Sequence, residues 1–127
     1  MKLGVISDTH NQLRPQVLEV FEGVDAILHA GDIGNEDIIT SLETIAPVHA
    51  VYGNTDYPPV RGNHPEWREL TFEGHSILLT HIFPHISERG IERLLERFGI
   101  SDAPELLIYG HTHEDLVRWC GKTLTIN

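Results

Sequence analysis

The chain is poor in the features that mark secreted and membrane proteins. It has one cysteine, Cys120, so no internal disulfide can form, and a cysteine-rich zinc or iron–sulfur site is not expected. No apolar run approaches the roughly 18 residues of a membrane span. The first residues, Met1 to Ser7, also lack the layout of a cleavable signal peptide. These absences lead us to expect a cytoplasmic protein.

Positive charge is scarce as well. Nine Lys and Arg oppose nineteen Asp and Glu, which gives a formal net charge of −10. Such a chain repels polyanions, so binding of long nucleic acids through a basic surface is not expected. Nine histidines, however, are many for 127 residues, and histidine is the commonest side chain for holding transition metals. The composition therefore favours a metal site.

The alternation of short apolar runs with helical patterns predicts an α/β fold with mixed sheet pairing and helices on the outer faces. A long Gly- and Pro-rich loop is expected between the parallel first half and the hairpins of the second, over residues 53–65. The strands are expected at 3–6, 25–29, 48–52, 67–72, 76–80, 105–109, 116–119 and 123–126. The helices are expected at 15–22, from the Asn35 cap to about 46, and at 87–98.

Polar side chains that can bind metals follow five of these strands directly. Because ligands of such folds gather beyond the carboxyl ends of strands, we expect these side chains to meet at one edge. Glycines 31, 53 and 110 beside them are expected to let the backbone turn sharply near the ions. The side chains are those of Asp8, His10, Asp32, Asn54, His81, His111 and His113.

Seven ligands are too many for one metal ion but suit two. A bridging carboxylate can join two ions that lie about 3.5–4 Å apart, with water completing each coordination shell. A mixture of oxygen and imidazole ligands suits Mn, Fe, Co, Ni or Zn better than Ca or Mg alone. The residues therefore predict a binuclear metal centre.

The same residues form ordered blocks that resemble a known family. "SDTHN" (7–11), "HAGDI" (29–33), "VYGNTD" (51–56) and "YGHTHED" (109–115), with His81 at a strand end, resemble the calcineurin-like metallophosphoesterases, especially their small bacterial and archaeal phosphodiesterase branch. The resemblance covers nearly the whole chain. It implies a single domain over 1–127, a four-layer α-β-β-α sandwich with two mixed sheets flanked by helices, and a metal site at the C-terminal ends of the strands.

The resemblance also implies how the ligands divide. Asp8, His10, Asp32 and His113 would hold one divalent ion, and Asp32, Asn54, His81 and His111 the other, so Asp32 would bridge them. Asp32, Asn54 and His10 are the residues expected to take part in catalysis, in which a water or hydroxide bridging the metals attacks phosphorus. Manganese is the expected metal, with nickel, cobalt, iron and zinc as alternatives.

Two departures from the family pattern concern possible proton donors. Thr55 stands where phosphatases of the family often have a histidine after the asparagine, so no general acid is evident there. The block usually written T-H-G-H is changed to Thr80-His81-Ile82-Phe83-Pro84-His85. We expect His85 to be a surface histidine at the start of a helix rather than a contact to substrate.

Three further polar residues near the blocks have alternative interpretations. His29 is expected to form hydrogen bonds close to the metal site. Asp56 could orient a ligand histidine or form a turn. Arg61 could steady a phosphate, although a solvated loop arginine is the simpler interpretation.

The function expected from these residues is hydrolysis of a small phosphate ester, most simply a diester. A phosphomonoesterase is an alternative. Another is a protein of the same fold that serves as a protein-binding scaffold, as the phosphoesterase-like subunit of retromer does; loss of ligands would mark that case, and all seven positions here carry competent ligands. A homodimer or higher homo-oligomer is also possible.

Overall fold

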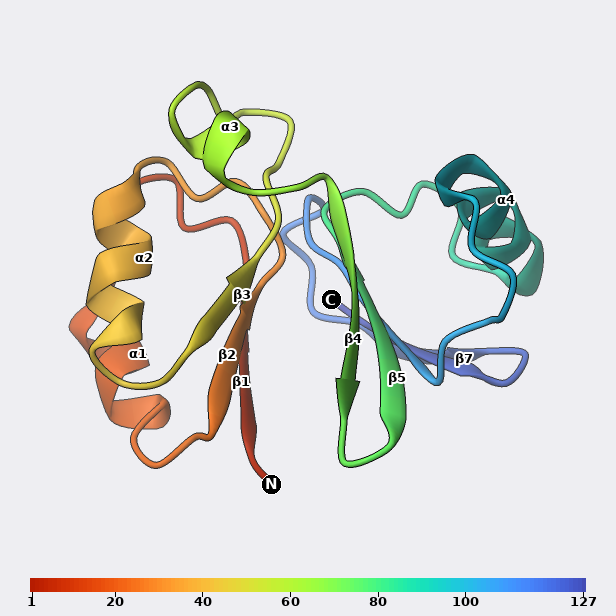
Figure 1. The fold of residues 1–127 in the computed structure, drawn as a ribbon, viewed down its shortest axis with the longest axis horizontal. Helices are drawn as coiled ribbons and strands as arrows, with labels where there is room; N and C mark the ends of the chain where they lie inside the picture. Colours follow the sequence, from red (N-terminus) through yellow and green to blue (C-terminus); the bar gives the residue numbers. More distant parts are fainter.

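Two β-sheets lie face to face between helices in the computed structural model, which describes residues 1–127. In Figure 1, helices α1 (Pro15–Val20) and α2 (Glu36–Glu43) cover the outer face of one sheet, and α4 (Glu88–Phe98) covers the other. This is the expected four-layer order of helix, sheet, sheet and helix. No helix is both long and apolar enough to span a membrane.

The first sheet holds the first half of the chain. It consists of β1 (Leu3–Ile6), β2 (Ala26–His29) and β3 (Val48–Ala50), which pair in parallel in that order. The central strand β2 is buried throughout, as its apolar sequence predicts. Because all three strands run the same way, their carboxyl ends open onto one edge of the sheet.

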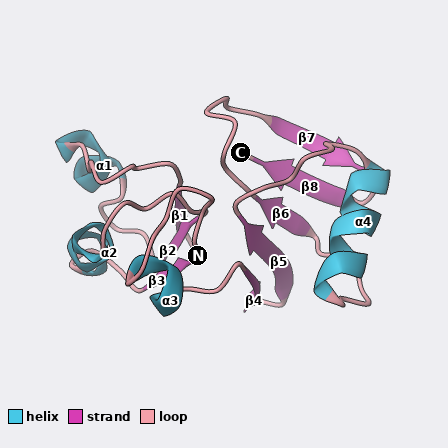
Figure 2. Ribbon diagram, turned by 90° about the horizontal axis from the view of Figure 1, so that it is seen from above, coloured by secondary structure: helices cyan, strands magenta, loops and turns pink.

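The second sheet holds the rest and mixes parallel with antiparallel pairing. Its strands are β4 (Trp67–Phe72), β5 (His75–Thr80), β6 (Leu106–Ile108), β7 (Val117–Cys120) and β8 (Thr123–Ile126), in the order β4-β5-β6-β8-β7 (Figure 2). The three central strands are parallel, whereas β4 and β7 are antiparallel edge strands. The carboxyl ends of β5 and β6 therefore also share an edge.

The two sheets are joined by an apolar layer between their inner faces. Leu28 from β2 and Ile77, Leu79 and Ile108 from the second sheet belong to one buried cluster, each at most 2% exposed. Each fully buried side chain of this size contributes roughly 1.5–3 kcal/mol to stability. This layer holds the carboxyl ends of both sheets in a fixed relation to each other.

Three sequence expectations differ from the structure. The resemblance implied two mixed sheets, but the first is entirely parallel, as the βαβ order of its segments predicted. The expected loop at 53–65 contains a short helix, α3 (Val60–Asn63), held by Val60, which is 2% exposed in the core. Helix α2 ends at Glu43 and β3 at Ala50, a few residues before their predicted ends.

Candidate metal centre

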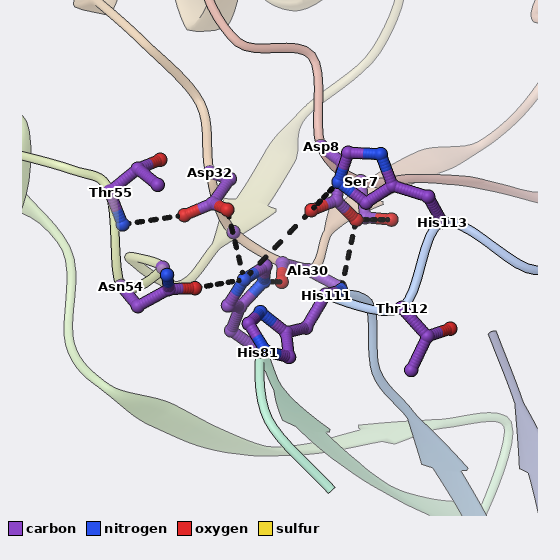
Figure 3. A network of polar contacts seen from close by, with 12 residues as sticks. Ser7, Asp8, Ala30, Asp32, Asn54, Thr55, His81, His111, Thr112 and His113 are labelled. Atoms are coloured by element: carbon purple, nitrogen blue, oxygen red, sulfur yellow. Dashed lines mark hydrogen bonds and ion pairs between the residues drawn. The ribbon is translucent and has the colours of Figure 1, made fainter.

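The loops that follow β1, β2, β3, β5 and β6 bring all seven predicted ligands together, six of which are labelled in Figure 3. Backbone hydrogen bonds tie these loops to one another. The amides of Asp8 and His10 donate to the carbonyls of Gly31 and Asp32, both at 2.9 Å, and the Gly110 amide donates to the His81 carbonyl at 3.0 Å. Residues from distant parts of the sequence are thus held at one edge, as the order of the strands predicts.

One group of possible ligands consists of Asp8, His10 and His113, whose ligand atoms lie within 4.8 Å of one another. His113 Nε2 lies 3.3 Å and His10 Nε2 3.8 Å from Asp8 Oδ1. The two histidine nitrogens are 3.4 Å apart. This is the set that the resemblance assigns to the first metal, apart from the shared Asp32.

A second group consists of Asp32, His81 and His111, again within 4.8 Å. The Nδ1 of His81 lies 2.7 Å from the Ala30 carbonyl, to which it can only donate, so the neutral ring carries its lone pair on Nε2. That Nε2 faces Asn54 Oδ1 at 2.9 Å and Asp32 Oδ2 at 3.2 Å. These three atoms all carry lone pairs and none can donate a hydrogen bond to another, so together they suit a bound cation.

Asp32 lies between the two groups. Its Oδ2 is 3.2 Å from His81 Nε2 and 3.6 Å from His10 Nε2, while its Oδ1 accepts a hydrogen bond from the Thr55 amide at 2.9 Å. Burial raises the pKa of the Asp32 carboxyl, but the hydrogen bonding of Thr55 and the nearby imidazoles of His81 and His10 outweigh it, so that this pKa lies below its ordinary value. The side chain is thus anionic at neutral pH and within reach of both groups.

An unpartnered oxygen of Asp8 also fits a bound cation. Its Oδ2 accepts hydrogen bonds from the Ser7 hydroxyl at 2.7 Å and from the His111 amide at 3.0 Å. Its Oδ1 is buried and has no hydrogen-bond partner. A buried carboxylate oxygen without a partner is costly unless a cation neutralises it. The residues present therefore fit two divalent metal ions.

The backbone of the candidate ligands is strained. Five of them have left-handed conformations, with φ values of 55° at Asp8, 45° at His10, 56° at Asp32, 77° at His111 and 60° at His113. Residues other than glycine lose roughly 1 kcal/mol in this conformation. The turns nevertheless direct the five side chains toward one another in the two groups, and strain of this kind is found chiefly at functional sites.

Close packing explains the glycines beside the ligands. A Cβ on Gly53 would lie 2.1 Å from Asp32 Oδ1 and 2.3 Å from the Asp32 amide nitrogen. A Cβ on Gly110 would lie 2.7 Å from Asp8 Oδ2. Gly31 is the one of the three with a positive φ, 99°. The predicted sharp turn is therefore present at Gly31, whereas Gly53 and Gly110 are required for close approach.

His29 lies beneath the site and has no exposed surface. Its Nδ1 accepts the Gly31 amide at 3.1 Å, and its Nε2 lies 3.0 Å from the Thr9 hydroxyl, which donates to the Ile33 carbonyl at 2.8 Å. Since Nδ1 accepts and Nε2 must donate, the ring is neutral. Burial lowers the pKa of His29 to about 4, against an opposing effect of the Asp56 and Asp8 charges.

The low pKa of His29 predicts a loss of stability in acid. The unfolded chain, with a His29 pKa near 6.5, binds more protons than the folded chain between that pH and about 4. The free energy of unfolding should therefore fall by about 3 kcal/mol as the pH is lowered through this range. Urea unfolding in EDTA from pH 7.5 to pH 4 measures this fall in the free energy of unfolding. His29→Gln should show a shallower dependence, and His85→Gln, at an exposed histidine, should follow the wild type; equal slopes in all three would contradict the assignment.

Asp56 ends a turn, as one sequence alternative described, since its amide donates to the Gly53 carbonyl at 3.2 Å, and its side chain has a further role. Its buried carboxylate accepts the amides of Gly53 at 2.8 Å, Gly34 at 3.0 Å and Ile33 at 3.2 Å. It contacts no ligand histidine, but it joins the loop after β2 to the loop after β3 and so holds Asp32 and Asn54 in place. The position alone, two residues after the asparagine, carries no signal of this role. His85, by contrast, is exposed just before α4, as expected.

Comparisons with known proteins show the family to which the chain is similar. Residues 1–127 match the calcineurin-like phosphoesterase superfamily domain. A probable metallophosphoesterase of Methanothermobacter thermautotrophicus is 39% identical over the whole chain and 75% of its own length. A phosphodiesterase of Methanocaldococcus jannaschii is 31% identical over the whole chain and 82% of its own length.

The fold is also shared by solved structures. A mutant of Vps29 from Entamoeba histolytica aligns with a TM-score of 0.79 and 24% identity, over all of this chain and 73% of that one. At this identity the likeness concerns the fold alone. The family match over the full chain and the two sequence relatives go further: this chain belongs to the calcineurin-like phosphoesterase superfamily.

Proposed function

We propose that the protein is a phosphodiesterase that uses two divalent metal ions to hydrolyse small phosphate esters. The observation that carries the proposal is the pair of Asp and His groups with Asp32 within reach of both. The 31% identity to a protein named a phosphodiesterase supports the choice of a diester.

The proposed ligands divide as the two groups lie. Asp8, His10 and His113 hold the first ion, and Asn54, His81 and His111 the second, with Asp32 shared. Bound divalent ions supply a water that loses its proton near neutral pH and positive charge that neutralises the phosphate oxygens. Manganese is the metal we expect to support the highest activity, ahead of nickel, cobalt, iron or zinc.

The protein's own hydrogen bonds prepare these ligands. The Ala30 carbonyl fixes the His81 tautomer, and the Ser7 hydroxyl fixes one oxygen of Asp8 so that the other stays free. Partners of this kind orient ligands and raise their affinity for metal. Thr55, next to Asn54, offers no acid for a poor leaving group, and this favours esters whose leaving group departs without protonation there.

The test is metal content followed by turnover. Purified protein reconstituted with Mn²⁺ should hold two equivalents of metal and hydrolyse bis-p-nitrophenyl phosphate faster than p-nitrophenyl phosphate. Chelation followed by dialysis should abolish the activity, and added Mn²⁺ should restore it. Less than one equivalent of bound metal would contradict the proposal, whereas two equivalents without turnover would favour the scaffold alternative.

A further inference from the structure

A cavity of about 240 Å³ opens beside the second group of ligands. Asn54 and His81 form one part of its wall, and Tyr52, Arg61 and Arg97 form another. At roughly 30 Å³ for a water-sized group, it accommodates a substituent of several non-hydrogen atoms. A phosphate held at Asn54 and His81 would therefore have room for one of its ester arms here.

The charges in this cavity differ from those of the protein as a whole. It is lined by two arginines and a single acidic residue, Glu66, although the whole chain carries a net charge of −10. Arg97 forms an ion pair with Glu66, which neutralises both. Among the arginines of the chain, ion pairs with carboxylates are formed by Arg97 and by Arg89, on α4, but not by Arg61. The charge of Arg61 is thus left without a partner.

Arg61 is also held in place. Its guanidinium carbon lies 4.5 Å from the centre of the Tyr52 ring, and this cation–π contact restricts the side chain. The backbone that carries it belongs to α3, which is anchored by buried Val60 and by the contact of His64 Nε2 with Glu36 Oε1 at 2.7 Å. A guanidinium that is ordered before binding loses less entropy when it binds an oxyanion.

We propose that this cavity is a substrate subsite in which Arg61 binds an oxyanion, a carboxylate or a second phosphate, on one arm of the phosphate ester. The proposal rests on the proposed function, because the scissile phosphate must lie at Asn54 and His81. It makes Arg61 a residue that determines specificity: the preferred substrates carry a further negative charge on that arm.

Two phosphonates that differ in one terminal group test this. Propylphosphonate and 2-carboxyethylphosphonate have the same chain length, and only the second carries a carboxylate. In the presence of Mn²⁺, calorimetry should show that the wild type binds the carboxylate compound about 10-fold more tightly, as expected for one charge-assisted hydrogen bond. Arg61→Ala should reduce this ratio to less than about two-fold, and Arg61→Lys should retain part of it.

The matched control is Arg93→Ala, which removes an exposed arginine on α4 outside the cavity and should keep the full ratio. Equal affinity of the wild type for the two phosphonates, or a ratio that survives in Arg61→Ala, would overturn the subsite. Hydrolysis of bis-p-nitrophenyl phosphate in the same preparations separates the two proposals: absent turnover contradicts the phosphodiesterase, while intact turnover with equal phosphonate binding contradicts the subsite alone.

Discussion

Replacing Asp32 by asparagine is expected to lower kcat/KM for bis-p-nitrophenyl phosphate by at least about 10³-fold, the loss typical of removing a central electrostatic group. Asp32 is 2% exposed, and its Oδ2 faces histidines of both ligand groups. Asparagine keeps the shape but removes the negative charge that two cations would share. Metal content should fall from two equivalents to one or fewer, as measured on dialysed protein.

Retention of fold is the condition for interpreting this variant. Asparagine can still accept the hydrogen bond of the Thr55 amide, so the loop after β3 should stay in place. Circular dichroism and thermal unfolding of metal-free protein would establish this. Asp102→Asn, at an exposed position away from the ligands, provides a matched loss of one charge and should retain wild-type turnover. Undiminished activity in folded Asp32→Asn would rule out its proposed role.

Gly53→Ala, which adds one methyl group, is expected to disrupt the metal site as severely as Asp32→Asn. The new Cβ would meet the Asp32 amide nitrogen at 2.3 Å, and because this is backbone, no side-chain rotation can relieve the contact. Overpacking of this kind costs about 3 kcal/mol, which corresponds to a fall of about 10 °C in Tm. Displacement of Asp32 should also lower the metal content, so that stability and metal binding are lost together.

Gly62→Ala is the matched control for this variant. Gly62 lies in α3, has nothing within 4 Å of an added Cβ, and does not have a positive φ. Alanine is favoured over glycine in a helix, so this variant should be as stable as the wild type or slightly more so. If Gly53→Ala unfolds at the same temperature as Gly62→Ala, the close approach of the two loops is not required for stability.

The location of the candidate site on each sheet could be predicted because it depends on the direction in which the strands run. Strands that run in parallel end at the same edge, so the polar residue that follows each strand must lie near the others. Asp8 after β1 and Asp32 after β2 show this within the first sheet. His111, after β6 of the second sheet, joins them because the apolar layer packs the two sheets together, and its amide donates to Asp8 Oδ2 at 3.0 Å although more than 100 residues of sequence separate them.

The parts that could not be predicted depend on contacts that leave no periodic pattern. Helix α3 has only four residues, and its placement depends on the burial of one of them, Val60. The role of Asp56 depends on three amides that approach it from two separate loops. The parallel pairing of the first sheet, by contrast, follows from its βαβ order and was predicted.

The left-handed backbone of five candidate ligands lowers the stability of the folded chain. At roughly 1 kcal/mol each, their strain sums to about 5 kcal/mol, which is comparable to the entire net stability of many small domains. Mutation to glycine at any of them would relieve the backbone strain but remove a candidate ligand. The stability of the fold and the presence of the candidate ligands are therefore opposed at these five positions.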